Sequence, residues 1–577
     1  KNLNMNKITP INPENWRVKK IGVIGPGIVG MPMASLLANA QIKIGSDTPA
    51  KVVIVQRQSV NSGWKVNAIN QGKSVIGGIE PDLDRITKSA FDAGTLSATT
   101  DYSNLSDADV ILVSVQTDKK GLEPDYGPLF EALENLGKAL QNKPADKIPM
   151  IVFESTLAPT TMDTLIRDHF KKFGLEEGKD ILLGNSPNRV MPGRLVERIA
   201  KSDKLAGGLS PVTPMLINKL YSHIVTQGQV FKTNSLTAEI VKTLENAYRD
   251  VRIAFSAEIA RYCDENNVDF YKLREKVNEL LSQSDLANDR PNEVPSGGIL
   301  IPTLGVGGHC LPKDGILLWW RKLESGSKSP SSLIIQSRNI NNQSPVLTFH
   351  QAEKAFDNIS KKKIALLGVA YRFNSEDTRN SPTLELANFL RENKVDYMMH
   401  DPYVKFDDQN VLKYNQQDFL THNLEKVLSD AEIIIVGTAH KEYIDKIDTI
   451  TSAPKLIGLM DACNIFKREY FSGRNIPYAG IGRGVGEPSP DFVGFVFDSF
   501  RAMEKGLALE LNNLIGFYNE NYAHDEFNKV KFEDVQYLAK TCSTGCEIAN
   551  PEKTDVLPVY NGFTPELTKL AFEISQN

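Results

Sequence analysis

The feature that most constrains the fold is a glycine loop between an apolar strand and a helix near the N-terminus. Residues 19–24 read as a buried strand, Gly25-Pro26-Gly27-Ile28-Val29-Gly30 follows, and a helix is predicted from there to residue 40. In this order the first glycine makes a tight turn, the second lets the backbone approach a pyrophosphate, and the third lets the helix pack closely. The helix N-terminus then faces the anion. The segment predicts a Rossmann-type dinucleotide-binding domain.

Two regions of the chain alternate strands and helices in this way. Apolar strand-like runs separated by helical stretches recur in the N-terminal region at 52–55, 110–115, 150–153 and 181–183. The second region has strand-like runs at 361–370, 396–400 and 433–436 and a helical run at 382–392. Such alternation is typical of doubly wound α/β domains. The sequence therefore predicts two Rossmann-like domains.

Residues 237–267 are predicted to form one long helix between these regions. Its apolar residues recur at helical spacing, at Ile240, Leu244, Ala247, Val251 and Ala254. Lys242 and Asn246 are four residues apart and share one side of this helix. Without further information such a pair is typical of a solvated helix face. The predicted fold class is α/β, with two Rossmann-like doubly wound domains joined by a long central helix and helical region.

A cysteine lies in a second glycine-rich segment, Gly305-Val306-Gly307-Gly308-His309-Cys310-Leu311-Pro312-Lys313-Asp314. Glycines let backbone N–H groups and a bulky ligand approach the sulfur. A cation three residues downstream favours the thiolate, which is the nucleophilic form. Most cysteines are buried small hydrophobes, but this setting predicts a reactive one. A nucleophilic thiol beside a dinucleotide domain indicates an oxidation that passes through an aldehyde to a carboxylate.

The composition argues against several classes of function. With 66 Lys and Arg residues against 71 Asp and Glu residues, the formal net charge is −5 and no strongly basic arm is present, so no nucleic-acid partner is predicted. No apolar run reaches about 18 residues and residues 1–20 are polar, so we expect no membrane association and a soluble, cytoplasmic protein. Five cysteines make no disulfide framework. Cys542 and Cys546 lack a second ligand pair, so no metal site is predicted.

Taken with their order along the chain, these motifs resemble the nucleotide-sugar 6-dehydrogenases, the UDP-glucose/GDP-mannose dehydrogenase family. The resemblance covers residues 19–484. Besides the two glycine segments, the matching stretches lie at 115–117, 154–156, 186–193, 242–246, 367–372, 377–382, 400–403 and 480–484. The Gly-Gly-His-Cys form and Pro192-Gly193-Arg194 look most similar to the UDP-N-acetylhexosamine 6-dehydrogenases.

The resemblance implies four regions. They are an NAD(P)-binding Rossmann domain at 19–235, a central helical dimerisation region with the catalytic cysteine loop at 236–345, a UDP-sugar-binding Rossmann-like domain at 346–484, and a C-terminal extension of unknown role at 485–577. In the extension, residues 492–520 look helical and residues 541–561 irregular. The family dimerises through its long helix, which implies a homodimer or a larger homo-oligomer. The active site is expected in the cleft between the two sheets, at the carboxyl ends of their strands.

The family's functional residues map onto this sequence by motif. The implied cofactor-binding residues are Gly25, Gly27, Ile28, Val29, Gly30, Arg57, Thr117, Thr156, Lys313 and Arg379. The implied substrate-binding residues are Asn188, Arg189, Lys242, Asn246, Gly307 and Arg372, where the arginine at 372 replaces the family's usual lysine. The implied catalytic residues are Cys310, Lys242, Asn246, Asp314 and Thr156.

The implied reaction is a four-electron oxidation of C6 of a nucleotide sugar, UDP-N-acetylhexosamine or UDP-glucose, to the uronate with two NAD. A water held by Lys242 and Asp314 accepts the first proton. Cys310 then forms a thiohemiacetal that is oxidised to a thioester and hydrolysed. Lys242 and Asn246 stabilise the oxyanion at each tetrahedral stage.

Two positions depart from the family pattern. Relatives often have a glutamate where this chain has Asn188, and an amide cannot act as the general base for thioester hydrolysis. Either another carboxylate such as Glu154 or Asp314 takes that role, or the hydrolytic step is altered. At the end of the second strand Gln56-Arg57 replaces the acid that usually binds the ribose 2′-OH. An arginine there also suits a 2′-phosphate, so NADP stays open beside NAD.

Other functions remain as alternatives at this stage. A degenerate member could bind nucleotide sugar without full turnover, but such a binder has no need of a nucleophile with polar supports. GDP-mannose is an alternative substrate. A two-electron dehydrogenase of the 6-phosphogluconate type needs no cysteine, and the second α/β region argues against it.

Overall fold

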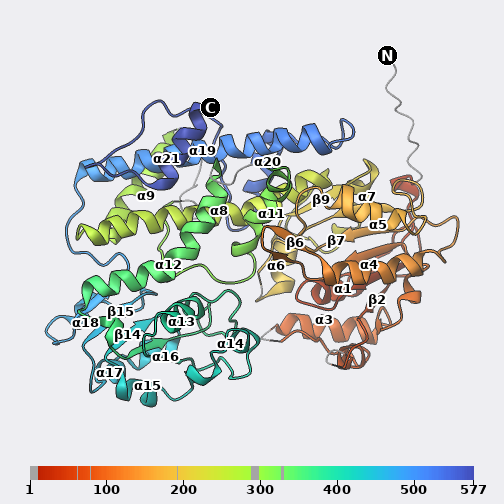
Figure 1. The fold of residues 1–577 in the computed structure, drawn as a ribbon. Helices are drawn as coiled ribbons and strands as arrows, with labels where there is room; N and C mark the ends of the chain where they lie inside the picture. The colour runs from red at the N-terminus through yellow and green to blue at the C-terminus, as the bar shows by residue number, and fades with distance from the viewer. Residues whose placement is uncertain (1–10, 61–62, 78–79, 192, 288–297, 327–330) are drawn as a thin grey trace. The chain divides into compact units, whose positions relative to one another are not determined.

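The computed structural model describes residues 11–577 except 61–62, 78–79, 192, 288–297 and 327–330, so Pro192 of the sequence motif lies outside the described residues (Figure 1). By its internal contacts the chain separates into two compact units, each described by itself below. The first comprises Lys1–Glu245, Leu317–Ser327 and Leu511–Cys546, and the second Asn246–Ile316, Lys328–Glu510 and Glu547–Asn577.

The first unit is built on an eight-stranded sheet with the order β10-β9-β8-β7-β4-β1-β2-β3. All neighbouring pairs are parallel except β8 and β9, which are antiparallel. The strands are β1 (Lys20–Ile24), β2 (Lys51–Val55), β3 (Leu96–Thr99), β4 (Val110–Val113), β7 (Met150–Phe153), β8 (Leu182–Asn185), β9 (Lys204–Gly208) and β10 (Val230–Asn234). The order in which the strands are added reverses between β1 and β4, and dinucleotides bind at this point in such folds.

Helices cover both faces of this sheet, so its central strands are apolar throughout. All four residues of β4 and of β7 are buried. Leu37 of α1 (Gly30–Asn39) and Leu220 of α7 (Val212–Tyr221) belong to one apolar core. Leu133 of α4 (Gly127–Leu140) and Phe170 of α5 (Arg167–Lys171) belong to the other. The predicted doubly wound domain is confirmed.

The remaining elements of this region are short or peripheral. They are η1 (Pro13–Asn15), α2 (Trp64–Ile69), α3 (Pro81–Asp92), η2 (Tyr102–Leu105), the antiparallel hairpin of β5 (Asp118–Lys120) and β6 (Glu123–Asp125), the π-helical turn η3 (Met162–Ile166) and α6 (Leu195–Lys201).

The second unit contains a six-stranded, all-parallel sheet with the order β13-β12-β11-β14-β15-β16. The strands are β11 (Ile364–Leu367), β12 (Tyr397–His400), β13 (Leu420–Thr421), β14 (Ile433–Val436), β15 (Gly458–Asp461) and β16 (Tyr478–Gly480). The second predicted Rossmann-like sheet is thus confirmed. The strand predicted at 361–370 is shorter than expected, because the backbone turns away at Gly368 with φ +95°.

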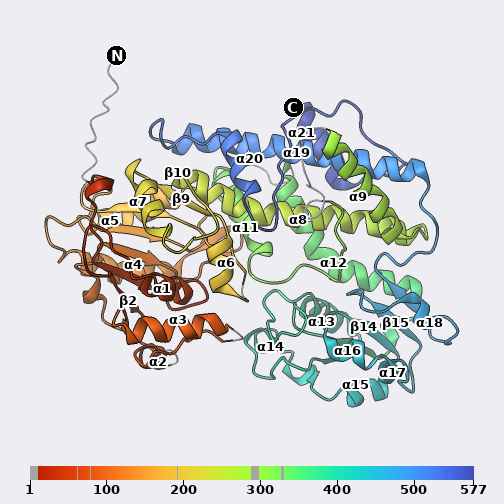
Figure 2. The ribbon, with the colours of Figure 1, turned by 180° about the vertical axis from the view of Figure 1, so that it is seen from behind.

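Helices again flank this sheet, as the view from behind also shows (Figure 2). The helices of one face, which share an apolar core with the strands, are α15 (Leu424–Asp430), α16 (Lys441–Asp445) and α17 (Ile447–Thr451). Helix α13 (Pro382–Glu392) contacts both β12 and α12 (Leu333–Ala355). The shorter helices are η5 (Ile359–Lys361), α14 (Gln409–Lys413), η6 (Gln417–Phe419) and α18 (Arg468–Phe471).

Helix α8 (Ser235–Glu265) is the predicted long helix, displaced by two residues. It is buried along most of its length, and all five residues of its predicted apolar face are buried in the chain. This face therefore offers no exposed apolar surface for the predicted dimer contact, and the oligomeric state stays a prediction. The other helices of the central region are α9 (Phe270–Ala287) and α11 (Leu311–Glu324).

The C-terminal extension consists of α19 (Pro490–Tyr522), α20 (Phe532–Lys540) and α21 (Glu566–Gln576), and residues 541–561 form no regular helix or strand, as predicted. Within the second unit it packs on α8. The rings of Phe563 and Tyr262 are stacked at 4.3 Å, and those of Phe500 and Phe255 meet edge-on at 5.6 Å. The extension is therefore part of the apolar core around α8.

A half-buried carboxylate of α8 also holds the extension. Glu258 accepts hydrogen bonds from the backbone N–H groups of Glu566 and Leu567, at 2.7 and 3.3 Å, and so caps the N-terminus of α21. Burial raises the pKa of Glu258 to about 7. Glu566 raises this pKa further, whereas the two backbone donors and Arg261 lower it.

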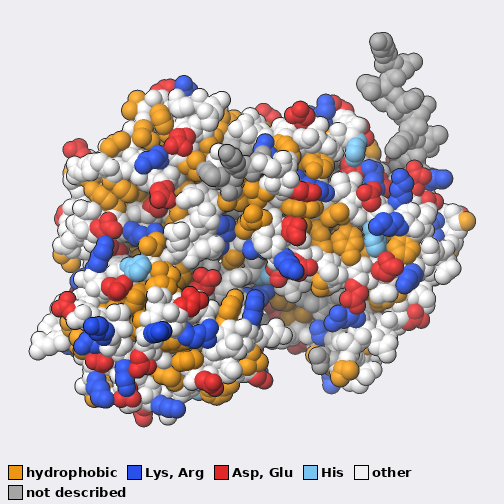
Figure 3. Space-filling view, in the orientation of Figure 1, with side chains coloured by type: hydrophobic (Ala, Val, Ile, Leu, Met, Phe, Trp, Pro, Cys, Tyr) orange, Lys and Arg blue, Asp and Glu red, His pale blue; other side chains and the backbone are white. Residues whose placement is uncertain are grey.

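Acidic and basic side chains are interspersed on the face shown in Figure 3. Among the described helices, none combines the length and apolar character needed to cross a bilayer.

The Glu258→Gln variant is expected to lose a pH dependence of stability that the natural chain has. The folded-state pKa of about 7 lies above the ordinary value of 4.5. The unfolded chain therefore releases this proton at lower pH, and the folded state loses stability as the pH rises through that window. In the natural chain the free energy of urea unfolding should fall by about 3 kcal/mol from about pH 5 to about pH 8 because of this group, and the variant should lack this fall.

Glu265→Gln is the matched control, because Glu265 ends the same helix with 62% of its side chain exposed. This control should keep the pH dependence of the natural chain. An identical pH dependence in both variants would contradict the role assigned to Glu258.

Candidate functional site

The loop after β1 has the geometry of a pyrophosphate cradle. Gly25 has φ +92° and donates its N–H to the carbonyl of Val55 at 3.1 Å. A Cβ on Gly30 would lie 1.8 Å from the carbonyl oxygen of Gly25, so only glycine lets α1 start this close to the strand. Next to Gly27, by contrast, nothing lies within 4 Å of the position of a Cβ. The loop thus leaves open space where a phosphate would approach the backbone.

The loops that follow neighbouring strands lie at the same edge of the sheet as the glycine loop. Ile28, beside the start of α1, is 49% exposed. Thr117 follows β4, and its hydroxyl donates to the carbonyl of Thr156, which follows β7, at 2.6 Å. Because parallel strands present their carboxyl ends at one edge, these loops and the glycine loop lie on the same side of the sheet. They fit a dinucleotide.

The end of β2 carries the departure seen in the sequence. Arg57 has a side chain that is 61% exposed, and its guanidinium lies 3.7 Å from the carboxylate of Glu131. An exposed pair of this kind is weak and easily replaced by a ligand. The arginine is therefore available to a ligand at the end of this strand.

The cysteine loop is held by residues of the loop between β11 and α13. Gly308 donates its N–H to the carbonyl of Arg379 at 2.8 Å, and Asn380 donates its side-chain amide to the carbonyl of Gly308, also at 2.8 Å. A Cβ on Gly307 would lie 2.5 Å from Cβ of Tyr371, so a larger residue cannot occupy that position without displacing the loop. The Gly-Gly pair therefore permits close packing of two segments far apart in the sequence.

Cys310 is exposed and directly precedes α11. Its carbonyl accepts the N–H groups of Lys313 and Asp314, at 3.1 and 2.9 Å, which closes the first turn of that helix. A thiol at a helix N-terminus lies at the positive end of the helix dipole, which favours the thiolate. The geometry is that of an accessible nucleophile.

The cation that interacts with this thiol differs from the one expected. Lys313 was predicted to favour the thiolate, but its ammonium is almost fully buried and lies 3.3 Å from the carboxylate of Asp314. Arg379 forms a bidentate pair with Asp377, which is the main cause raising its pKa, and the Cys310 thiolate raises it as well. Arg379 and Cys310 therefore interact electrostatically. The sequence motif contained this arginine but assigned it to the cofactor.

Asp314 joins the cysteine helix to α8. The amide of Asn246 donates to one oxygen of its carboxylate at 2.6 Å. The other oxygen, beside Lys313, is buried and accepts no hydrogen bond within the described part of the chain. A buried carboxylate oxygen without a donor can hold a water or a substrate hydroxyl.

Lys242 lies one turn before Asn246 on α8, so the two side chains share one side of the helix. Lys242 is only 9% exposed. Among the described residues its ammonium has no hydrogen-bond or ion-pair partner. A buried cation is normally paired, and one without a partner indicates a binding or catalytic position.

Two predicted substrate residues are bound within the protein. The side-chain amide of Asn188 donates to the carbonyl of Val190 at 3.1 Å. Arg189 is buried and forms an ion pair with Glu245, with its Nε 2.9 Å from the carboxylate. Its other donors bind Asp203, Leu538 and Thr541, so in this arrangement no guanidinium N–H remains for a substrate. Arg372, in contrast, is exposed.

Both carboxylates considered as the base for thioester hydrolysis are bound within the protein. Glu154 is buried, with one oxygen 3.0 Å from the ammonium of Lys204 and the other bound by the hydroxyl of Tyr221. Asp314 is buried as well, with one oxygen bound by the amide of Asn246 and the other 3.3 Å from the ammonium of Lys313. Which of them takes the role of base therefore stays a prediction.

Sequence reasoning missed Glu245, the partner of Arg189. It lies three residues after Lys242 and one before Asn246, and a glutamate buried on an apolar helix requires a partner. That signal was present in the sequence, but the identity of the partner was not. The described residues contain no group of three or more His, Cys, Asp or Glu side chains arranged to hold a metal ion.

Comparison with known proteins agrees with this arrangement. Three family models of the UDP-glucose/GDP-mannose dehydrogenase family match the chain, the NAD binding domain at residues 19–225, the central domain at 236–343 and the UDP binding domain at 365–468. Residues 485–577 lie outside all three matches.

Relatives match over nearly their whole length. The UDP-N-acetyl-D-mannosamine dehydrogenase of Pyrococcus horikoshii is 32% identical over 472 residues, which are 81% of this chain and 99% of that protein. Its solved structure has a TM-score of 0.65 at 31% identity, over 81% of this chain and 99% of that one. The NDP-N-acetyl-D-galactosaminuronic acid dehydrogenase of Methanosarcina mazei Go1 has a TM-score of 0.69 at 30% identity, over 81% of this chain and 96% of that one. These matches confirm the resemblance seen in the motifs, and the chain belongs to the UDP-glucose/GDP-mannose dehydrogenase family.

Proposed function

We propose that the protein oxidises C6 of a UDP-N-acetylhexosamine to the uronate, with removal of four electrons. The observation that carries this proposal is the exposed thiol of Cys310 at the start of α11, whose Asp314 binds Asn246 of α8. The names of two relatives, UDP-N-acetyl-D-mannosamine dehydrogenase and NDP-N-acetyl-D-galactosaminuronic acid dehydrogenase, support an N-acetylhexosamine as the sugar.

The residues that hold the cofactor are Gly25, Gly27 and Gly30 at the pyrophosphate, with Thr117 and Thr156 at the same edge of the sheet. NAD, when bound, supplies the hydride acceptor for each oxidation. Arg57 at the end of β2 lets NADP serve as an alternative, because a guanidinium suits a 2′-phosphate. Arg372 and Gly307 are assigned to the substrate.

The alcohol is oxidised first. A water held by Lys242 and Asp314 takes the hydroxyl proton, since a carboxylate at that position can accept it through the water. Lys242, which lacks a partner among the described residues, is placed by this proposal at the C6 oxygen. Its positive charge then favours the developing negative charge on oxygen.

The aldehyde is next trapped by Cys310. The sulfur forms a bond to C6 and the carbonyl oxygen takes a proton, which gives a thiohemiacetal that can lose a second hydride. The resulting thioester is attacked by water, the C–S bond breaks, and Cys310 leaves as the thiolate. Lys242 and the amide of Asn246 stabilise the oxyanion in each tetrahedral stage.

The reaction is tested directly by incubating the protein with a panel of nucleotide sugars, GDP-mannose included, together with NAD or NADP. Absorbance of the reduced cofactor and the amount of uronate are followed together. Two reduced cofactors for each uronate formed from a UDP-N-acetylhexosamine are expected. Reduction with GDP-mannose alone would contradict the proposed substrate.

Cys310→Ser is expected to abolish uronate formation and leave NAD affinity within about twofold, because a serine hydroxyl is a far weaker nucleophile than a thiolate. Uronate is measured by chromatography and NAD affinity by calorimetry. Cys463→Ser serves as control, because this half-buried thiol lies beside Asp461, just after β15. Full four-electron turnover by the Cys310 variant would refute the covalent mechanism.

Arg57→Asp is expected to shift the preference from NADP toward NAD by at least about tenfold, because a carboxylate hydrogen-bonds a ribose 2′-OH and repels a 2′-phosphate. The ratio of kcat/KM for the two cofactors measures the shift. Arg85→Asp, at a similarly exposed site on α3, is the control for added negative charge. An unchanged ratio would show that Arg57 does not face the adenosine ribose.

Asn188→Glu is expected to shorten the lifetime of an acylated Cys310. Since an amide cannot accept the proton of the attacking water, hydrolysis in the natural chain should be slow enough for the adduct to accumulate. Intact-protein mass spectrometry after rapid quenching should detect this adduct, and less of it in the variant. If the natural chain shows neither the adduct nor a burst of reduced cofactor, hydrolysis is not limiting.

A further inference from the structure

The C-terminal extension reaches the residues next to the proposed catalytic side chains within the first unit. Leu538 and Thr541, at the C-terminal end of α20, bind the guanidinium of Arg189, the carbonyl of Leu538 at 3.0 Å and the hydroxyl of Thr541 at 2.8 Å. The same guanidinium binds Glu245 of α8. The positive charge thus lies between the negative end of the α20 dipole and a buried carboxylate.

All five donors of Arg189 are used in this arrangement. Nε and Nη2 bind Glu245, Nη2 also binds Leu538, and Nη1 binds Thr541 and Asp203. The side chains of Arg189 and Glu245 are 3% and 5% exposed. A buried, fully satisfied guanidinium fixes its partners more tightly than an exposed ion pair does, because losing any one bond leaves a buried donor unpaired.

The extension also holds the first turn of α8. Asn234 accepts the N–H of Thr237 at 2.8 Å and so acts as the N-cap of this helix. The amide of the same side chain donates to the carbonyls of Phe527 and Lys529, at 2.9 and 2.8 Å. Tyr537 of α20 packs edge-on against Phe231 of β10, at 5.8 Å.

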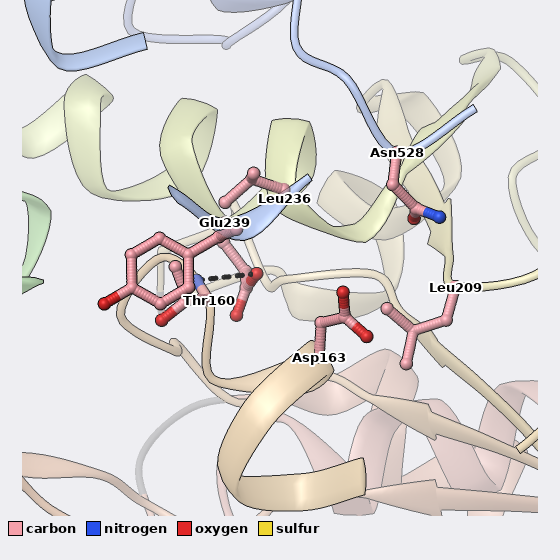
Figure 4. A pocket seen from close by; sticks show the side chains of 7 residues that line it. Thr160, Asp163, Leu209, Leu236, Glu239 and Asn528 are labelled. Carbon is pink, nitrogen blue, oxygen red and sulfur yellow. Dashed lines mark hydrogen bonds between the residues drawn. The ribbon is translucent and has the colours of Figure 1, made fainter. Parts of the chain in front are cut away.

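A small pocket beside this region is closed by the extension as well. It is lined by Thr160, Asp163, Leu209, Leu236, Glu239, Tyr522 and Asn528, and Figure 4 shows Glu239 of α8 accepting the N–H of Thr160. In addition, the hydroxyl of Tyr518 in α19 donates to the carbonyl of Leu318 in α11 at 2.6 Å. The extension therefore contacts the helix that carries Lys242 and the helix that begins directly after Cys310.

We infer that residues 518–546 are a positioning element of the active site, acting through Thr541, Arg189 and Glu245 on the turn of α8 that carries Lys242 and Asn246. This inference rests on the proposed function. Glu245 lies three residues after Lys242 and one before Asn246, so its pairing sets the rotation of that turn about the helix axis. Relatives that match 81% of this chain over 99% of their own length accommodate α8 without an added segment of this size.

The test uses Thr541→Val in the full chain, which removes one hydroxyl and keeps the side-chain shape. With UDP-N-acetylmannosamine and NAD, kcat is expected to fall about tenfold. One buried guanidinium N–H of Arg189 then lacks a partner, so the pair of Arg189 with Glu245 holds the turn of α8 less firmly. KM for NAD should stay within about twofold, because the glycine loop is distant from α20 in the sheet. That loop follows β1, and four strands separate β1 from β10, the strand against which α20 packs. Thr541→Ser, which keeps the hydroxyl, should restore kcat.

The matched control is Thr564→Val, which also removes a hydroxyl bonded to a backbone carbonyl of the extension, that of Pro558 at 2.6 Å. This control should keep the kcat of the natural chain. Equal losses of kcat in Thr541→Val and Thr564→Val would overturn the inference, because they would reflect general loosening of the extension. An unchanged kcat in Thr541→Val would overturn it as well.

Hydrogen exchange of α8 provides a second readout that does not depend on turnover. Peptides covering residues 235–250 are expected to exchange faster in Thr541→Val than in the natural chain, in Thr541→Ser and in Thr564→Val. If the natural chain oxidises no nucleotide sugar, the proposed function fails while this measurement still decides whether the extension holds α8. Unchanged exchange in Thr541→Val would refute the positioning role.

Discussion

The pairing of five carboxylates on α8, three buried and two half-buried, is the interaction on which the rest of the structure depends. A charge removed from water is costly unless it is paired and hydrogen-bonded, so each of these side chains must find a partner in another segment. Their partners are the turn before η3 for Glu239, Arg189 for Glu245, Arg338 of α12 for Asp250, the start of α21 for Glu258, and Gly482 for Asp264. Five parts of the chain are thereby fixed to one helix.

The proposed catalytic groups follow from the same constraint. Lys242 and Asn246 lie among these paired carboxylates, so their helix cannot slide or rotate without breaking several buried contacts. Asn246 binds Asp314, and the carbonyl of Cys310 closes the first turn of the helix that contains Asp314. Two consecutive hydrogen bonds, Asn246 to Asp314 and Asp314 to the carbonyl of Cys310, therefore position Cys310 relative to the Asn246 amide. Lys242 differs from its neighbours, since it alone of these charges lacks a partner among the described residues.

Much of the fold was predictable because its local signals are strong. The glycine loop, the runs of β-branched residues in β2 and β14, and the helix at Pro382–Glu392 were each found from pattern alone. Boundaries were less reliable, as the early end of β11 shows. The roles expected for Glu154 and Lys313 depend on more than their motifs. An acid or a base in a motif has the right chemistry, but its availability depends on partners that are distant in sequence, here Lys204 and Tyr221 for Glu154.

The sequence by itself determined the two doubly wound α/β domains, the dinucleotide loop and the place of Cys310 in a glycine-rich loop, because the signals for each lie within short stretches of the chain. Only the tertiary structure decided that Lys313 pairs with Asp314, that Lys204 and Tyr221 enclose Glu154, and what the C-terminal extension contacts. Arg189 and Thr541 are 352 residues apart, and their 2.8 Å hydrogen bond forms only when α20 packs against the first sheet. Contacts of that sequence separation follow from how the elements pack, which no local pattern encodes.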